Sequence, residues 1–216
     1  MFFQKIFVNT QTQIAIWQIE ESERQLTQLY EPNAEERAEL GTFQNENRRK
    51  AYLSARLALR EALGEVFVLE KQASSKPFLP QRLDCEISLT HTKGFAAAMV
   101  NSNKQKVGID LEWIRPKIRA VKNKFLEDKE QVLLEKNRTY TNELQVLTQV
   151  WSAKEAIYKC YGEKGLDFKK NMQVIDFKDN VCIIHLNTVN LSKNIAVHIR
   201  NIVEGLVLVW CIEPNN

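Results

Sequence analysis

The sequence WSAKEAIYK, residues 151–159, places an acid and two bases at helical spacing. In a helix, at about 100° per residue, Glu155 and Lys159 lie one turn apart on the line that begins at Trp151. Lys154 falls near the middle of the apolar stripe of the same helix, where a cation needs a partner. Glu155 and Lys159 could also form an ordinary surface ion pair, worth only about 0.3–0.5 kcal/mol. This segment alone leaves both interpretations open, and Trp151 is expected to serve packing.

The sequence VGIDLE, residues 107–112, has the alternation of a strand and carries two carboxylates. Because successive side chains of a strand point to opposite faces, Asp110 and Glu112 share one face. Two adjacent carboxylates repel each other unless a cation neutralises them. Oxygen ligands without His or Cys favour Mg²⁺, which takes a few carboxylates together with water and phosphate oxygens. An exposed edge strand could instead hold the same pair in solvent.

Basic side chains in the first half of the chain could meet an anion. Residues 47–63 are predicted to form a helix, on which Arg49 and Arg56 belong to a basic stripe beside the apolar face. Lys76 precedes a proline, which holds it in an extended loop. His91 lies near the end of a predicted strand. A solvated helix flank and a structural histidine are the alternatives to anion binding.

The elements that must position these residues predict an α+β fold. Each half of the chain has a helix followed by strands, and each ends in an apolar strand after a glycine turn, at Gly94 and Gly205. This coarse repeat predicts a pseudo-twofold pair of similar α+β halves, residues 1–105 and 106–216, with the active site in the cleft between them. The predicted helices are 31–40, 47–63, 121–134 and 143–161. The predicted strands are 14–19, two within 86–100, one from residue 107, and 174–177, 181–186, 195–200 and 206–212.

The composition is that of an ordinary globular protein, with 44% hydrophobic and 26% charged residues. A net charge of +3 is too small to argue for nucleic acid, and no apolar run is long enough to span a membrane. Neither partner is therefore expected. The four cysteines show no CxxC spacing, which argues against zinc and favours reduced packing cysteines in a cytoplasmic protein.

The VGIDLE and WSAKEAIYK motifs, preceded by the ISLTHT strand, together resemble the 4′-phosphopantetheinyl transferase superfamily. The closer similarity is to the long, two-half type that modifies carrier proteins of non-ribosomal peptide, polyketide and siderophore synthesis. The resemblance covers roughly residues 47–165. It has departures: Ser75 replaces a common glycine before the Lys-Pro dipeptide, Thr90 replaces the usual serine before the histidine, and Glu127 replaces a helix-capping serine.

The resemblance implies transfer of the 4′-phosphopantetheine arm of coenzyme A to a serine of an apo acyl or peptidyl carrier protein, with release of adenosine 3′,5′-bisphosphate. It implies Mg²⁺ held by Asp110, Glu112 and Glu155. The residues it assigns to the co-substrate coenzyme A are Arg49, Arg56, Lys76, Thr90, His91 and Lys154. The base for the serine proton is Glu155, Lys159 or Glu130, of which the resemblance favours Glu155 assisted by Lys159. The two-half length implies a monomer.

Two other functions stay open. A coenzyme A-binding or scaffold protein could keep the cleft without turnover, although a decayed site has no need to keep several charged groups together. A nucleotidyltransferase would use nucleoside triphosphates, but the sequence has no Walker-type loop or GxGxxG motif in its support.

Overall fold

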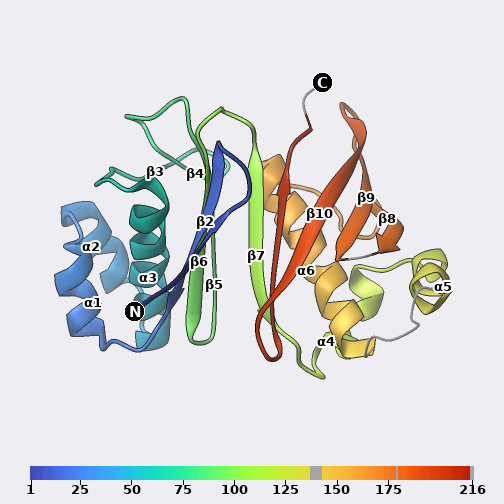
Figure 1. Ribbon diagram of the computed structural model, residues 1–216, viewed down its shortest axis with the longest axis horizontal. Helices are drawn as coiled ribbons and strands as arrows, with labels where there is room; N and C mark the ends of the chain where they lie inside the picture. Colours follow the sequence, from blue (N-terminus) through green and yellow to red (C-terminus); the bar gives the residue numbers. More distant parts are fainter. Residues whose placement is uncertain (137–142, 179, 215–216) are drawn as a thin grey trace. The chain divides into compact units, whose positions relative to one another are not determined.

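The structure, a computed structural model, describes residues 1–136, 143–178 and 180–214 of an α+β chain (Figure 1). The chain divides into two compact units. The N-terminal unit comprises residues 1–70 and 77–104, and the C-terminal unit comprises residues 71–76 and 105–216. Within the described ranges, no helix combines the length and the apolar character needed to cross a membrane.

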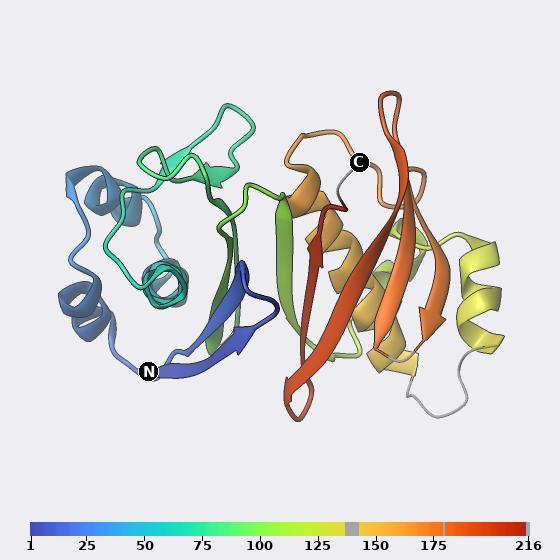
Figure 2. The same cartoon turned by 45° about the horizontal axis from the view of Figure 1, so that its top comes forward.

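The N-terminal unit is an antiparallel sheet of order β1-β2-β6-β5 with the long helix α3 against it (Figure 2). The α3 helix begins after Asn45, whose side chain accepts a hydrogen bond from the Asn47 amide. It ends at Gly64, which has a left-handed φ of 77°. The elements of this unit are β1 (Phe2–Phe7), β2 (Thr12–Gln18), α1 (Glu23–Tyr30), α2 (Ala34–Gly41), α3 (Glu46–Leu63), β5 (Glu86–Thr92) and β6 (Phe95–Asn101). A short strand pair, β3 (Glu70–Lys71) and β4 (Pro77–Phe78), lies between α3 and β5 in the sequence.

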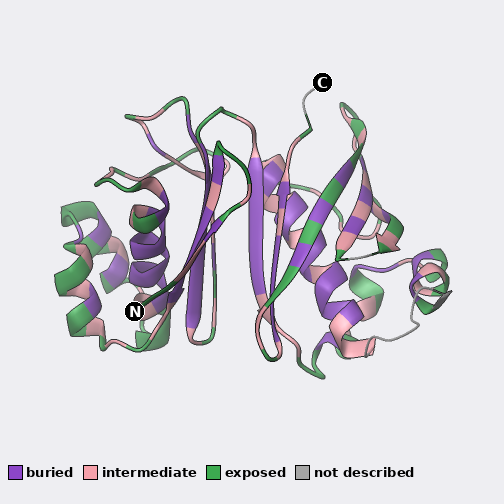
Figure 3. Cartoon of the chain, in the orientation of Figure 1, coloured by how far each residue is buried: buried purple, intermediate pink, exposed green. Residues whose placement is uncertain are grey.

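The C-terminal unit is an antiparallel sheet of order β7-β11-β10-β9-β8, and the helix α6 packs against it. Most residues of α6 are buried (Figure 3). Its apolar side chains form one core with the inward side chains of the sheet. The strands are β7 (Val107–Trp113), β8 (Met172–Lys178), β9 (Val181–Asn187), β10 (Ser192–Val203) and β11 (Leu206–Ile212). The helices are α4 (Ile118–Val121), the 3₁₀ turn η1 (Lys122–Lys124), α5 (Asp128–Lys136) and α6 (Glu143–Tyr161).

The two units are similar, as the sequence predicted. Each is an antiparallel sheet with one long helix packed against it, and in each a hairpin turns at a glycine. Gly94 joins β5 to β6 with a φ of 81°, and Gly205 joins β10 to β11 with a φ of 76°. Both values lie in the left-handed region that favours glycine, which is why the sequence marks both turns.

Most predicted helices and strands are confirmed, but the continuous helix predicted for residues 121–134 is wrong. The chain there forms α4, η1 and α5, separated by a stretch in which Phe125 and Leu126 are buried. The backbone leaves helical geometry at Phe125, where φ is -129° and ψ is -8°, so η1 ends there and α5 begins separately at Asp128. The strand β1 was not predicted, because it has little polar alternation and is held by pairing with β2. All four cysteines are buried and unpaired, which confirms their packing role.

The helix α6 lies so close to β7 that Gly108 has no room for a side chain. A Cβ atom at Gly108 would lie 1.8 Å from the carbonyl oxygen of Ala156 and 2.9 Å from the Cβ atom of Cys160. Ala156 and Cys160 are small residues one turn apart on α6, and Ser152 lies one turn before them. This close approach brings the polar side chains of β7 and α6 together.

We predict that Gly108→Ala destabilises the protein by about 1–3 kcal/mol or more, because the added methyl group collides with the backbone of α6. Urea unfolding monitored by circular dichroism measures this loss. Gly41→Ala is the matched control, since a Cβ atom at Gly41 meets nothing within 4 Å and its φ is not positive. Equal unfolding midpoints for the two variants would contradict the proposed constraint.

Candidate active site

Two side chains of β7 and three of α6 form a polar cluster in the C-terminal unit. The Asp110 carboxylate accepts hydrogen bonds at both oxygens, from Ser152 Oγ at 2.7 Å and from Lys159 Nζ at 2.8 Å. Lys159 Nζ also donates to the carbonyl oxygen of Ile109 at 2.9 Å. Glu112 and Glu155 interact electrostatically with Asp110 and with Lys159. The structure therefore brings together Asp110, Glu112, Glu155 and Lys159, four of the residues predicted from the sequence.

The carboxylates of this cluster repel one another electrostatically. Burial and then the negative charge of Asp110 raise the pKa of Glu112, while Arg115 and Lys159 oppose the shift. The pKa of Glu155 is raised by burial, by Asp110 and by Glu112, and is lowered by Lys159. Both shifts have the direction expected for carboxylates that lose water and gain like-charged neighbours. Lys159 and Arg115 therefore compensate only part of the negative charge of the carboxylates.

The donor atoms of the cluster fit a hard divalent cation such as Mg²⁺, because they are all oxygens and carry excess negative charge. Across the described ranges, however, no group of three or more His, Cys, Asp or Glu side chains is already arranged to hold a metal ion. The ammonium group of Lys159 stands beside Asp110 and supplies positive charge there. The residues thus suit the cation in type, while their arrangement is that of an ion-paired state.

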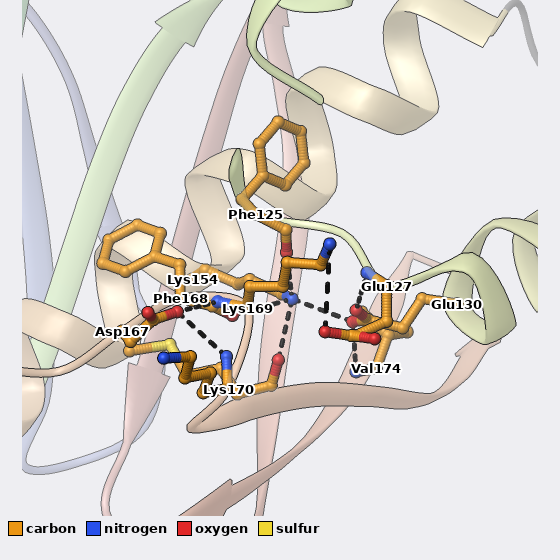
Figure 4. Close-up of polar contacts among 10 residues, drawn as sticks. Phe125, Glu127, Glu130, Lys154, Asp167, Phe168, Lys169, Lys170 and Val174 are labelled. Atoms are coloured by element: carbon orange, nitrogen blue, oxygen red, sulfur yellow. Dashed lines mark hydrogen bonds and ion pairs between the residues drawn. The ribbon is translucent and has the colours of Figure 1, made fainter. Parts of the chain in front are cut away.

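Lys154 lies elsewhere than the sequence predicted. It is fully buried, and its ammonium group lies 2.8 Å from Glu130 Oε1 (Figure 4). The carbonyl oxygens around the same nitrogen belong to Phe125 at 2.5 Å, Met172 at 2.7 Å and Phe168 at 3.1 Å. This ring of acceptors provides the partners that a cation inside an apolar stripe requires, and leaves Lys154 no exposed face for a phosphate.

Glu130 is the counterpart of Lys154 and is also buried, with 1% of its surface exposed. Its Oε1 atom accepts a further hydrogen bond from the Val174 amide at 2.8 Å, and its Oε2 atom accepts one from the Glu127 amide at 2.7 Å (Figure 4). The carboxylate therefore joins the start of α5 to β8. These contacts give Glu130 a structural role in place of the predicted role as a candidate base.

We predict that Lys154→Met destabilises the protein by about 3–5 kcal/mol, because it leaves the buried carboxylate of Glu130 unpaired. The double variant Lys154→Met/Glu130→Gln should recover part of this loss, since it also removes the orphaned charge. Chemical unfolding in urea measures both effects.

The matched control for this pair is Lys169→Met. Lys169 pairs with Glu127 at 4.0 Å and both side chains are partly exposed, so its loss should change the stability by less than about 1 kcal/mol. If Lys154→Met and Lys169→Met lose similar amounts of stability, burial of the Lys154–Glu130 pair does not increase its contribution to stability.

The remaining predicted residues divide between several places. His91 lines a cavity of about 870 Å³ in the N-terminal unit, together with Arg48, Lys50 and Lys93. These three cations were not predicted from the sequence. Arg48 lies about 100° around α3 from Arg49, on the polar side of the helix, and its guanidinium stacks 4.4 Å above the Phe43 ring. The position of Arg48 relative to the apolar stripe is the signal that could have found it.

Arg49 and Arg56 instead join helices within the N-terminal unit. Arg49 donates to Glu23 at 2.8 Å and to the carbonyl oxygen of Phe43 at 2.5 Å. Arg56 is buried, pairs with Glu36 at 3.0 Å and lies 3.2 Å from the centre of the Tyr52 ring. Neither arginine lines the cavity beside His91.

Two further predicted residues are separated from His91. Thr90 precedes His91 in β5 and is buried, on the opposite side of the strand. Lys76 belongs to the C-terminal unit and lies beside the end of α6, where a Cβ atom on Gly162 would come 2.9 Å from Lys76 Cδ. The structure thus brings His91 together with Arg48, Lys50 and Lys93, and not with the basic residues that were predicted to share its site.

Comparison with known protein families shows to which family the chain belongs. Residues 106–211, which carry the carboxylate cluster, match the family model of the 4′-phosphopantetheinyl transferase superfamily. Residues 37–101 match the model of the 4′-phosphopantetheinyl transferase N-terminal domain. The chain belongs to this superfamily. No curated protein matches it.

The phosphopantetheinyl transferase family uses coenzyme A and acts on carrier proteins. The two matches follow one another along the sequence, as expected for the type with two similar halves. Family membership supports transferase activity in general, and the carboxylate cluster lies within the part of the chain that matches the superfamily model.

We predict that Glu155→Gln stabilises the protein in the absence of metal, because it removes a carboxylate whose ionised form is disfavoured by its surroundings. The midpoint of thermal unfolding near neutral pH should rise by a few degrees, since about 1 kcal/mol corresponds to roughly 2–4 °C at this chain length. The raised pKa means that the folded state binds this proton more tightly than the unfolded state does. The gain should therefore shrink as the pH falls through the raised pKa of Glu155, and vanish below its ordinary value of 4.5.

Glu163→Gln is the control for this prediction, because Glu163 is exposed and follows the end of α6. Asp110→Asn should act in the opposite direction, since it weakens the pair with Lys159. A Glu155→Gln variant that is less stable than the wild type at neutral pH would contradict the proposed repulsion of Glu155 by Asp110 and Glu112.

Proposed function

We propose that the protein transfers the 4′-phosphopantetheine group of coenzyme A to a serine of an apo acyl or peptidyl carrier protein, as a holo-[acyl-carrier-protein] synthase type enzyme. The reaction depends on Mg²⁺ and releases adenosine 3′,5′-bisphosphate. The observation that carries the proposal is the cluster of three mutually coupled carboxylates and a lysine on facing surfaces of β7 and α6. The match of this region to the superfamily supports it.

Asp110, Glu112 and Glu155 are the residues that would hold Mg²⁺. Bound there, the cation would neutralise charge on the pyrophosphate of coenzyme A, which is its usual contribution to phosphoryl transfer. Lys159 already contributes a positive charge to the cluster through its contact with Asp110. Phosphoryl transfer needs mainly charge neutralisation and positioning, and these residues can supply both.

The carrier serine loses its proton as its oxygen attacks the phosphorus atom that carries the pantetheine arm. The bond from this phosphorus to the oxygen of adenosine 3′,5′-bisphosphate breaks, and the new serine–phosphorus bond forms. We assign the serine proton to Glu155, the carboxylate that α6 brings into the cluster beside Asp110 and Glu112. Lys159 assists by its charge. Glu130 is not part of this step, because the Lys154 ion pair and two amides engage it.

The cavity of the N-terminal unit is the proposed binding place for a phosphate of coenzyme A. Its volume of about 870 Å³ suits a ligand of this size, and Arg48, Lys50, His91 and Lys93 are basic residues at its wall. Arginine offers forked donors to phosphate, and lysine offers a point charge. Lys76, at the end of α6, is a further cation that we assign to coenzyme A.

We predict that Arg48→Ala raises the KM for coenzyme A by about tenfold with little change in kcat, since it removes uniform substrate binding. Steady-state kinetics at varied coenzyme A measures this. Arg24→Ala is the matched control, because Arg24 is exposed on α1 and does not line the cavity. Arg56→Ala should instead lower the thermal stability, because it breaks the buried pair with Glu36. An unchanged KM for Arg48→Ala would remove the cavity from the coenzyme A site.

The proposed function is tested by mass spectrometry of a panel of apo carrier proteins incubated with the protein, coenzyme A and Mg²⁺. A mass gain of one phosphopantetheine group on the carrier serine is the expected result, and Asp110→Ala should abolish it. Absence of the gain with every carrier, together with measurable coenzyme A binding, would favour the alternative of a coenzyme A-binding or scaffold protein without turnover.

We also propose that the protein works in the cytoplasm as a monomer. Four buried, unpaired cysteines support a reducing compartment. The monomer is supported by the presence of two similar units in one chain. Sedimentation of the purified protein at several concentrations tests the second point.

A further inference from the structure

The hydroxyl group of Ser152 has a buried position in the carboxylate cluster. Ser152 is fully buried on α6, and its Oγ atom donates to Asp110 Oδ2 at 2.7 Å. This distance is the usual one for a hydroxyl donor, and the acceptor is a carboxylate oxygen. The contact joins two elements that are 42 residues apart in the sequence.

Ser152 does not follow the usual behaviour of a hydroxyl group inside a helix. Ser and Thr commonly donate to the carbonyl oxygen one turn earlier, and Thr148 on the same helix does so, with Leu144 at 2.7 Å. A serine hydroxyl has a single proton to donate. In Ser152 that proton is directed away from the helix backbone and onto the carboxylate of β7.

The second oxygen of Asp110 is fixed from the same helix. Lys159, two turns after Ser152, donates to Asp110 Oδ1 at 2.8 Å and to the backbone of β7 at Ile109. Two donors on one helix therefore determine both the position and the rotation of a carboxylate on the neighbouring strand. The Gly108 contact keeps the helix at the distance that these two hydrogen bonds require.

We propose that Ser152 is a positioning residue for Asp110 and sets the affinity of the site for a divalent cation. The inference rests on the proposed metal site. Groups that hydrogen-bond a metal-binding side chain typically contribute about 10–100-fold to metal affinity, because they hold it in the binding orientation. Without the hydroxyl group, Asp110 keeps its charge and its contact with Lys159 but loses the hydrogen bond from Ser152 to Oδ2.

The experiment measures binding of Mn²⁺ or Mg²⁺ to the full chain without coenzyme A, by calorimetric titration. Ser152→Ala should weaken binding by about 10–100-fold. The thermal unfolding midpoint of each variant, measured without metal, confirms that the folded protein is being titrated.

Ser54→Ala is a closely matched control. Ser54 is also fully buried on a long helix, α3, but its hydroxyl group has no hydrogen-bond partner. The same atom is removed in both variants, and Ser54→Ala should leave the metal affinity unchanged. A Ser152→Ala variant that binds metal as tightly as Ser54→Ala overturns the inference.

The metal titration separates this inference from the proposed function. Weaker binding by Ser152→Ala supports the positioning role even if no carrier protein gains a phosphopantetheine group. Transfer to a carrier with unchanged metal affinity of Ser152→Ala supports the function and overturns the positioning role. A wild-type protein that binds no divalent cation overturns both the metal site and the role of Ser152.

Discussion

The contact of α6 with β7 is the constraint on which the candidate site depends. Gly108 lets the helix backbone approach the strand, and Ser152, Ala156 and Cys160 are small enough to lie along the contact. In this narrow space the polar side chains of both elements lose contact with water and must form hydrogen bonds and ion pairs with one another. Asp110 succeeds through Ser152 and Lys159, whereas Glu112 and Glu155 have raised pKa values. The packing that stabilises the C-terminal unit thus also creates the electrostatic cost of its site.

The two lysines of the α6 motif show how position on one helix separates structure from chemistry. Lys154 and Lys159 are five residues apart and point about 140° away from each other. The first is enclosed by Glu130 and three carbonyl oxygens, whereas the second is partly exposed and reaches the carboxylates of β7. The buried pair joins α6 to the start of α5 and to β8. The motif therefore combines a structural cation with one available to the site.

Local periodicity was enough to predict most elements of the fold and the faces that carry the carboxylate cluster. Asp110 and Glu112 follow strand alternation, and Glu155 and Lys159 follow the helical repeat, so their faces can be read from sequence. The partners of Lys154 and Arg56 could not be predicted, because Glu130 and Glu36 come from distant elements brought near only by packing. Both cations border or interrupt apolar stripes, and in both cases a buried carboxylate satisfies the charge. Helical periodicity places Arg48 on the polar side of α3, but the cavity that it lines with His91 and Lys93 forms only when α3 packs against the sheet, so the sequence could not single it out.

The charges of the carboxylate cluster explain why its resting arrangement and its proposed working arrangement differ. Three carboxylates and one lysine leave a formal excess of two negative charges when all are ionised. Partial burial reduces the screening of this excess by water, and the raised pKa values of Glu112 and Glu155 are the result. A divalent cation carries the charge needed for balance, and a pyrophosphate would bring further negative charge that Lys159 can share. A site neutral without metal would gain little from binding one, so the unrelieved repulsion is what gives the cluster its proposed affinity for Mg²⁺.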